Sequence, residues 1–246
     1  MTYDPKTAHR LALLSDFAYG EPDEATGAAA GIGAEAARFI ENNETETLVC
    51  KFGPDVFVTY RGTEPMTFWD LLTDARICLK PAEGIAGDVH AGFGYSIGNT
   101  WNDTLQTVDS LLGRDGFVYW GGHSKGGAEA TLAAARFAQM GRGNVGAVHT
   151  FGSPAVGGLA FATEFEAVLG GRVFRHVHRS DLTARSPYFL RLFGKYRPVG
   201  KLVYHNGGRT FHPSPIRRLV DLCRAVSSKR WRADHDLAHY IGETKC

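Results

Sequence analysis

The chain has 246 residues, and its 27 Lys and Arg against 26 Asp and Glu give a formal net charge of only +1 at pH 7. Hydrophobic residues make up 43% and charged residues 22% of the sequence, which is typical of a globular protein with a sizeable core. The length fits one α/β domain spanning residues 1–246, and we expect no nucleic-acid partner.

The first residues lack the features of a secretion signal. Residues 1–6 contain neither a basic start nor a continuous apolar run, and no segment approaches the length needed to span a bilayer. The cysteines at 50, 78, 223 and 246 have no paired spacing, so we expect reduced thiols. The sequence therefore indicates either a cytoplasmic protein or export by a non-classical route.

Charge is distributed unevenly along the chain. Residues 1–171 carry 11 Lys and Arg against 21 Asp and Glu, whereas residues 172–232 carry 15 against two. Such asymmetry is typical of a surface that attracts anions such as phospholipid headgroups. The alternative is that the two parts fold together and neutralise each other.

The N-terminal part predicts helices followed by a hairpin. Residues 7–19 have the spacing of an amphipathic helix, and the alanine-rich residues 25–42 predict a helix from about Gly33. Two β-branched and aromatic runs at 47–52 and 55–60 flank a Gly-Pro pair, so we expect them to form a strand hairpin.

Strands and helices alternate in the rest of the chain. Further strands are predicted at 117–120, 145–151, 173–177 and 202–204, and helices at 96–112, 125–140, 159–169 and 216–227. This alternation predicts an α/β fold with a mostly parallel central sheet and helices on both faces. The first hairpin makes one end antiparallel, and functional sites in such sheets lie at the carboxyl ends of the strands.

Two segments match the pattern Gly-x-Ser-x-Gly. Residues 122–126 (Gly-His-Ser-Lys-Gly) stand between a predicted strand and a predicted helix, the context in which this pattern forms a nucleophile elbow. Residues 94–98 follow no apolar strand and fall inside a predicted helix. We therefore select Ser124 as the candidate nucleophile and reject Ser96.

A serine nucleophile requires a base and an acidic residue that orients the base. Asp181 ends a predicted strand and is the only acid between Glu166 and Asp221, so it is the candidate acid. The alternative role for Asp181 is to cap a helix or a turn. Four histidines follow it in the sequence, and spacing alone leaves the base open among His205, His212, His235 and His239.

Four segments in a fixed order resemble class 3 (fungal-type) lipases of the α/β-hydrolase superfamily. They are Tyr-Arg-Gly-Thr-Glu at 60–64, His-Ala-Gly-Phe at 90–93, Gly-His-Ser-Lys-Gly-Gly at 122–127, and Asp234-His235 with Tyr240. The resemblance implies an α/β-hydrolase fold, Ser124 as nucleophile, Asp181 as orienting acid and His235 as base. His239 would then be a neighbour outside the triad.

The resemblance also implies an activity. We expect a serine carboxylic-ester hydrolase that cleaves acylglycerols at a lipid–water interface through an acyl-enzyme, with no cofactor and no metal. A phospholipase A-type acyl hydrolase is the alternative. Two stretches favour that alternative: the basic residues 172–232 and the aromatic residues 187–193. The aromatic residues would line an acyl groove, touch the lipid interface or pack in the core.

The tetrahedral intermediate of such a reaction needs hydrogen-bond donors for its oxyanion. The elbow itself assigns the backbone N–H of Lys125, and the resemblance assigns Thr63 as the second donor. We expect the Lys125 side chain to face solvent. Residues 66–80 carry apolar side chains at helical spacing, which predicts either a lid over the site or a fixed core helix.

Two other classes of function remain open. His235 and His239 have the spacing of zinc ligands on a helix, but Asp236 stands where a zinc protease needs a glutamate. A non-catalytic binding module is the other alternative, since a fold does not determine a function. The acid and the histidine in the correct chain order argue against it.

Overall fold

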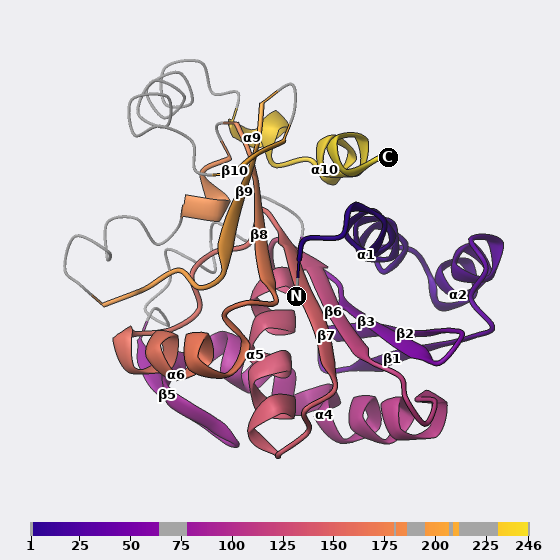
Figure 1. The fold of residues 1–246 in the computed structure, drawn as a ribbon, viewed down its shortest axis with the longest axis horizontal. Helices are drawn as coiled ribbons and strands as arrows, with labels where there is room; N and C mark the ends of the chain where they lie inside the picture. The colour runs from indigo at the N-terminus through magenta and orange to yellow at the C-terminus, as the bar shows by residue number, and fades with distance from the viewer. Residues whose placement is uncertain are drawn as a thin grey trace.

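A central eight-stranded sheet lies between two layers of helices (Figure 1). The computed structural model describes residues 2–63, 78–179, 181–185, 195–206, 209–211 and 231–245. The strand order is β1-β2-β3-β6-β7-β8-β9-β10, and β4 and β5 form a separate ribbon. The predicted fold class, a mostly parallel sheet with helices on both faces, is confirmed.

The elements of the sheet and of its helical layers have the following bounds. The strands of the sheet are β1 (Ala36–Asn42), β2 (Thr45–Phe52), β3 (Asp55–Tyr60), β6 (Val118–His123), β7 (Val145–Phe151), β8 (Val173–His178), β9 (Lys201–His205) and β10 (Arg209–Phe211). The ribbon is β4 (Leu79–Ala82) and β5 (Ile85–His90). The helices are α1 (Pro5–Phe17), α2 (Pro22–Gly31), α4 (Ala91–Leu111), α5 (Lys125–Gln139), α6 (Leu159–Leu169), α9 (Trp231–Asp234) and α10 (Leu237–Thr244), with a 3₁₀ turn η1 (Thr183–Arg185).

The middle of the sheet is parallel and its edges are antiparallel. Strands β3, β6, β7, β8 and β9 pair in parallel, whereas β1, β2 and β3 form a meander and β10 pairs antiparallel with β9. The carboxyl ends of the parallel strands therefore meet along one edge, where sites of α/β sheets are found.

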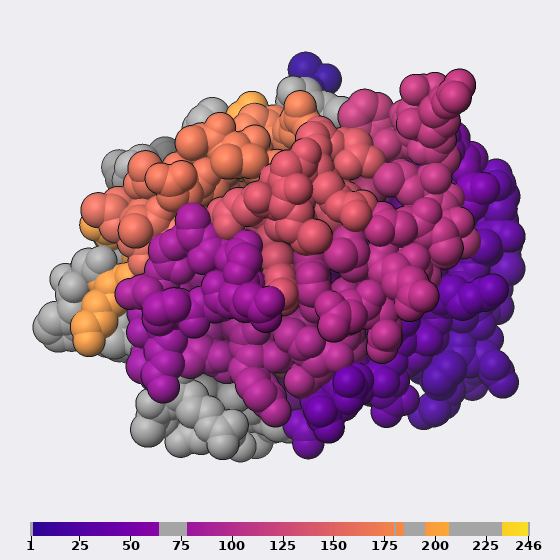
Figure 2. Space-filling view, turned by 90° about the horizontal axis from the view of Figure 1, so that it is seen from below, coloured from indigo at the N-terminus to yellow at the C-terminus, as the bar shows by residue number. Residues whose placement is uncertain are grey.

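Alternating side chains of the strands supply two cores. In β3, Val56 and Val58 join the cluster under α4, α5 and α6, while Phe57 joins the cluster under α1 and α10. Figure 1 shows α1 and α10 on one side of the sheet and α5 and α6 on the other. From below, β5 forms part of the outer surface beside α6 (Figure 2). No helix in the described part of the chain is both long and apolar enough to cross a bilayer.

The predicted helix from Gly33 to residue 42 is wrong. The helix α2 lies earlier, and Gly33, with φ of +95°, follows its end. Residues 36–42 form β1, which pairs antiparallel with β2. Asn43 and Glu44 form the connecting turn with φ of 47° and 62°, the left-handed pair that a two-residue hairpin requires. Alanine content favoured a helix here, but pairing with β2 determined the structure.

The other predicted elements agree closely with the structure, with a few exceptions. Strand 145–151 and helix 159–169 have the predicted bounds. The helix predicted at 96–112 begins at Ala91, and the strands β4, β5 and β10 were not predicted. Ser96 does lie inside that helix. The predicted helix 216–227, the aromatic residues 187–193 and most of the predicted lid lie outside the described residues.

Several histidines are buried in a neutral form. His90 precedes α4, accepts the amide hydrogen of Phe93 on its Nδ1, and stacks on the Phe93 ring at 4.2 Å between centroids. The Nδ1 atom of His149 on β7 lies 3.0 Å from Nε2 of His176 on β8. The Nδ1 atom of His176 lies 2.8 Å from Nε2 of His205 on β9. Burial lowers the pKa of His90 to about 4 and that of His149 to about 3. Both histidines are therefore uncharged in the folded protein at neutral pH.

These lowered pKa values predict that the fold loses stability in acid. The folded pKa lies below the unfolded value of about 6.5, so the unfolded chain binds more protons as the pH falls from 6.5. The stabilisation is complete above pH 6.5 and decreases by about 1.4 kcal/mol per pH unit for each such histidine down to its folded pKa. Urea unfolding at pH 7.5, 6.5, 5.5 and 4.5 measures this loss.

His90→Asn is the matched variant for this prediction. Asparagine keeps an acceptor for the start of α4 but does not titrate. Between pH 6.5 and 4.5 its free energy of unfolding should fall by about 2 kcal/mol less than that of the wild type. Parallel pH curves for the two proteins would contradict the role given to His90.

Candidate active site

Ser124 occupies a strained turn between β6 and α5. Its backbone has φ of 56° and ψ of −125°, a conformation that residues with side chains rarely adopt. Its amide donates to the carbonyl of Phe151 at 2.9 Å, and its own carbonyl accepts from the Gly127 amide at 3.1 Å. These two bonds hold the turn from both sides, as a nucleophile elbow requires.

The glycines on either side of Ser124 are required by close backbone approach. A Cβ atom on Gly122 would collide with the backbone of Gly126. A Cβ atom on Gly126 would collide with the carbonyl of Tyr60 on the neighbouring strand β3. Both glycines of the pentapeptide are thus fixed by packing, and strand and helix can meet at a sharp angle.

The structure brings Ser124, His235 and Asp181 together. The Nε2 atom of His235 lies 3.0 Å from Ser124 Oγ, and its Nδ1 atom lies 3.0 Å from Asp181 Oδ2. Ser124 follows β6, Asp181 follows β8, and His235 stands in the turn between α9 and α10. All three side chains are buried. This is the arrangement in which an imidazole can take the serine proton while an acid orients it.

Asp181 is held as an anion by four hydrogen bonds. Its Oδ2 accepts from His235 and, at 2.6 Å, from the Tyr240 hydroxyl. Its Oδ1 accepts from the amides of Thr183 at 2.8 Å and Ala184 at 3.3 Å. Burial by itself would raise the pKa of Asp181, but the contacts with His235 and Tyr240 hold that pKa below its ordinary value. Asp181 therefore caps η1 and orients His235 at once.

His123 supports the base, His235, through a hydrogen bond to its backbone. Its Nε2–H donates to the His235 carbonyl at 2.7 Å, so its Nδ1 accepts from the Tyr19 hydroxyl at 2.9 Å. The His123 and His235 rings lie 4.5 Å apart between centroids. Burial, and then the neighbouring His235, lower the pKa of His123 to about 3. A neutral His123 can support a protonated His235 without placing a second charge beside it.

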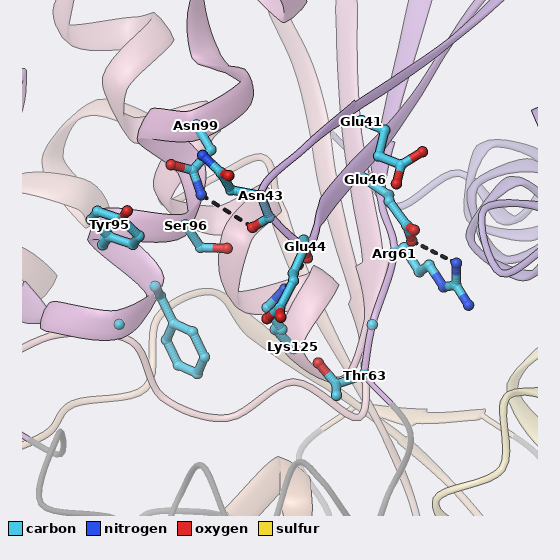
Figure 3. Close-up of a pocket in the computed structure, with 13 residues that line it drawn as sticks. Glu41, Asn43, Glu44, Glu46, Arg61, Thr63, Tyr95, Ser96, Asn99 and Lys125 are labelled. Atoms are coloured by element: carbon cyan, nitrogen blue, oxygen red, sulfur yellow. Dashed lines mark hydrogen bonds and ion pairs between the residues drawn. The ribbon is translucent and has the colours of Figure 1, made fainter.

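The two residues predicted for the oxyanion hole line one cavity. Thr63 follows β3, and Lys125 begins α5; both border a cavity of about 610 Å³ (Figure 3). Its other walls are mainly polar, with Glu41, Glu46, Asn99 and Arg61 among them. The role of Thr63 and Lys125 as amide donors to an oxyanion stays a prediction.

The prediction for the Lys125 side chain is wrong. Only 13% of it is exposed, and its Nζ lies 3.1 Å from a carboxylate oxygen of Glu129. The sequence places Glu129 one helical turn later, but its burial comes from packing of α5 against other elements.

The arrangement of His235 and His239 disfavours a zinc site. Both ring nitrogens of His235 are engaged, by Ser124 and by Asp181. The ring of His239 instead stacks on His178, with centroids 4.7 Å apart. Within the described ranges, no group of three or more His, Cys, Asp or Glu side chains could hold a metal ion.

Tyr240, His123 and Tyr19 were not assigned any role from the sequence. The sequence held a signal for Tyr240, because its spacing from Leu237 places both residues on the apolar face of a helix and predicts their burial. Both are buried in α10. A buried tyrosine needs a partner for its hydroxyl, which points to a nearby polar group. No comparable signal identified the contacts of His123 or Tyr19.

Comparisons with known proteins agree with this geometry. The family model described as Lipase (class 3) matches residues 57–190, more than half of the chain. Phospholipase A1-Igamma1, chloroplastic, of Arabidopsis thaliana is 30% identical over 214 residues, covering 74% of this chain and 40% of that protein. Lipase ZK262.3 of Caenorhabditis elegans is 30% identical over 149 residues, covering 59% of this chain and 41% of that protein.

The chain thus spans about two fifths of the length of the curated relatives it matches. Among solved structures, a Rhizomucor miehei lipase propeptide complex superposes with a TM-score of 0.66 at 21% identity, over 89% of this chain and 76% of the other. That likeness shows the α/β-hydrolase fold. The family match confirms the resemblance found in the sequence, and the chain belongs to the class 3 lipases.

Proposed function

We propose that this protein hydrolyses carboxylic esters of acyl lipids through a covalent acyl-enzyme on Ser124. The observation that carries the proposal is the continuous chain of hydrogen bonds from Ser124 through His235 to Asp181. Membership of the class 3 lipases supports the same chemistry. A binding module would have no need for a strained serine in contact with an oriented base.

The geometry supports the following reaction. His235 Nε2 takes the Ser124 Oγ proton as Oγ attacks the ester carbonyl carbon, and the amides of Lys125 and Thr63 bind the oxyanion. The tetrahedral intermediate collapses, and the alcohol leaves with the proton from His235. Water then enters, gives a proton to His235 and attacks the acyl carbon. The second tetrahedral intermediate collapses with cleavage of the Oγ–acyl bond, Ser124 Oγ takes the proton back from His235, and the fatty acid leaves. Asp181 stabilises the imidazolium in both halves.

Acylglycerols are the proposed substrates, and phospholipids are the alternative. One matched structure carries the description of a triacylglycerol lipase with a serine protease triad, and one relative is named a phospholipase A1. The basic composition of residues 172–232 favours an anionic lipid surface, although most of that stretch lies outside the described residues.

Loss of the nucleophile or the base should abolish turnover. Ser124→Ala and His235→Ala should each lower kcat by about 10⁴-fold or more, because the two groups act as a unit. His239→Ala is the matched control, since His239 contacts His178 and not the triad, and it should retain most of kcat. Initial rates on a soluble p-nitrophenyl ester measure this.

A fluorophosphonate probe tests the nucleophile directly. Folded wild-type protein should be labelled and Ser124→Ala should not. Absence of labelling in folded wild-type protein, or a His239→Ala variant as inactive as His235→Ala, would contradict these assignments.

Removal of the Tyr240 hydroxyl should slow the reaction without unfolding the protein. Tyr240→Phe keeps the ring against Phe151 but leaves Asp181 with one donor fewer on Oδ2. The imidazolium is then less well oriented, so kcat should fall about tenfold with KM nearly unchanged. A kcat within twofold of wild type would show that the hydroxyl does not act on the triad.

A substrate panel separates the two lipid classes. Acyl-chain profiling on p-nitrophenyl esters should be followed by monoacylglycerol, triacylglycerol, phosphatidylcholine and phosphatidylglycerol at equal interfacial area. We expect the highest kcat/KM on an acylglycerol. Faster release of fatty acid from phosphatidylglycerol than from either acylglycerol would establish the phospholipase alternative.

A further inference from the structure

Glu129 is a carboxylate without exposed surface in the second turn of α5. Its Oε1 faces Lys125 Nζ at 3.1 Å and also accepts a hydrogen bond from Ser96 Oγ. Among the described residues its Oε2 has no hydrogen-bond partner. Burial raises the pKa of Glu129, while Lys125 and Ser96 act in the opposite direction. A buried carboxylate is costly unless it is paired, so both contacts matter to it.

The side chain of Lys125 connects two separate parts of the fold. Besides its ion pair with Glu129, Lys125 Nζ donates to the carbonyl of Glu44 at 3.2 Å. Glu44 belongs to the left-handed turn between β1 and β2. The start of α5 is therefore tied to that turn and to its own second turn by one ammonium group.

Ser96 and Thr45 hold Glu129 from the opposite side. Thr45 Oγ1 lies 2.9 Å from Ser96 Oγ and 3.1 Å from the Ser96 carbonyl. Because a carboxylate only accepts, the Ser96 proton points to Glu129. The network thus joins α5 to α4 and β2. Figure 3 shows Ser96, Glu44 and Lys125 around the same cavity as Thr63.

Stability alone does not explain this buried ion pair. Replacing such a pair with packed apolar residues is often neutral or stabilising. What the structure shows is that the Lys125 ammonium is held between two partners, 3.1 Å from Glu129 Oε1 and 3.2 Å from the Glu44 carbonyl. Lys125 directly follows Ser124, whose strained backbone persists only where its surroundings hold it. The network anchors the residue that carries the oxyanion amide.

We infer that Glu129, acting through Lys125, is a positioning residue that fixes the Lys125 amide in the oxyanion hole. This inference rests on the proposed ester hydrolysis by Ser124. A preorganised donor stabilises the developing charge only at the correct distance, and a misplacement of about 1 Å is enough to slow an enzyme markedly.

The test combines four variants with one control. Glu129→Gln and Lys125→Met each break the ion pair and keep the amide, the double variant measures their coupling, and Lys125→Arg keeps the charge. Asp109→Asn is the control: it removes an exposed ion pair with Arg142, with the same change of charge as Glu129→Gln. The readouts are kcat and KM on a soluble p-nitrophenyl ester, fluorophosphonate labelling, and Tm.

A positioning role predicts a specific pattern. Both single variants should lose about 10- to 100-fold in kcat with KM within twofold, and the double variant should be no slower than the slower single variant. Labelling should be slower but reach the wild-type extent, because the fold is intact. Lys125→Arg should recover most of kcat, and Asp109→Asn should match the wild type.

Other results would overturn the inference. A Glu129→Gln kcat equal to that of Asp109→Asn, additive losses in the double variant, or a labelling extent that falls in proportion to kcat would each show that the network does not position the amide. Wild-type protein that neither hydrolyses esters nor reacts with the probe would instead overturn the proposed function, and this inference with it.

Discussion

The left-handed backbone of Ser124 is the constraint on which the site depends. A residue with a side chain adopts φ of 56° only when the surrounding structure holds it there. Here β3 and β7 flank β6, the glycines of the pentapeptide allow the helix to approach, and the Phe151 carbonyl holds the serine amide. The parallel centre of the sheet therefore serves to hold one strained residue, with the N-terminus of α5 behind it.

The packing of α10 against α1 on one face of the sheet then completes the triad. The helix α10 packs against α1, and Leu237 and Tyr240 join the same core cluster as Leu11 and Leu14. His235 immediately precedes this helix, so the base is positioned by the burial of an apolar face rather than by local sequence. Tyr240 extends the connection, because its hydroxyl accepts from the His178 amide and donates to Asp181. Core packing and orientation of the base are thus one structural feature.

The geometry agrees with the predictions where the deciding interaction is local. The elbow is encoded in consecutive residues, and Asp181 stood out because acids are scarce after residue 166. Selection of His235 required the family resemblance, because α10 docks through contacts remote in the sequence. The segment 36–42 was misassigned since its strand forms by pairing with β2, with the Asn43–Glu44 turn as the overlooked signal. The Lys125 side chain was expected to face solvent, and only the packing of α4 on α5 shows that it lies against a buried Glu129.

The two Gly-x-Ser-x-Gly segments show how context decides the chemistry of a serine. Ser96 lies inside α4, and its hydroxyl donates to the carboxylate of Glu129. This hydrogen bond stabilises the Glu129 anion and does not provide Ser96 with a base. Ser124 lies at the end of a strand, and its hydroxyl faces a base that Asp181 orients. The Ser96 hydroxyl nevertheless belongs to the network that reaches Lys125, the residue after the nucleophile. The segment 94–98, which forms no nucleophile elbow, thus supports the elbow at Ser124. It does so through the Glu129 carboxylate of α5, which Ser96 of α4 contacts.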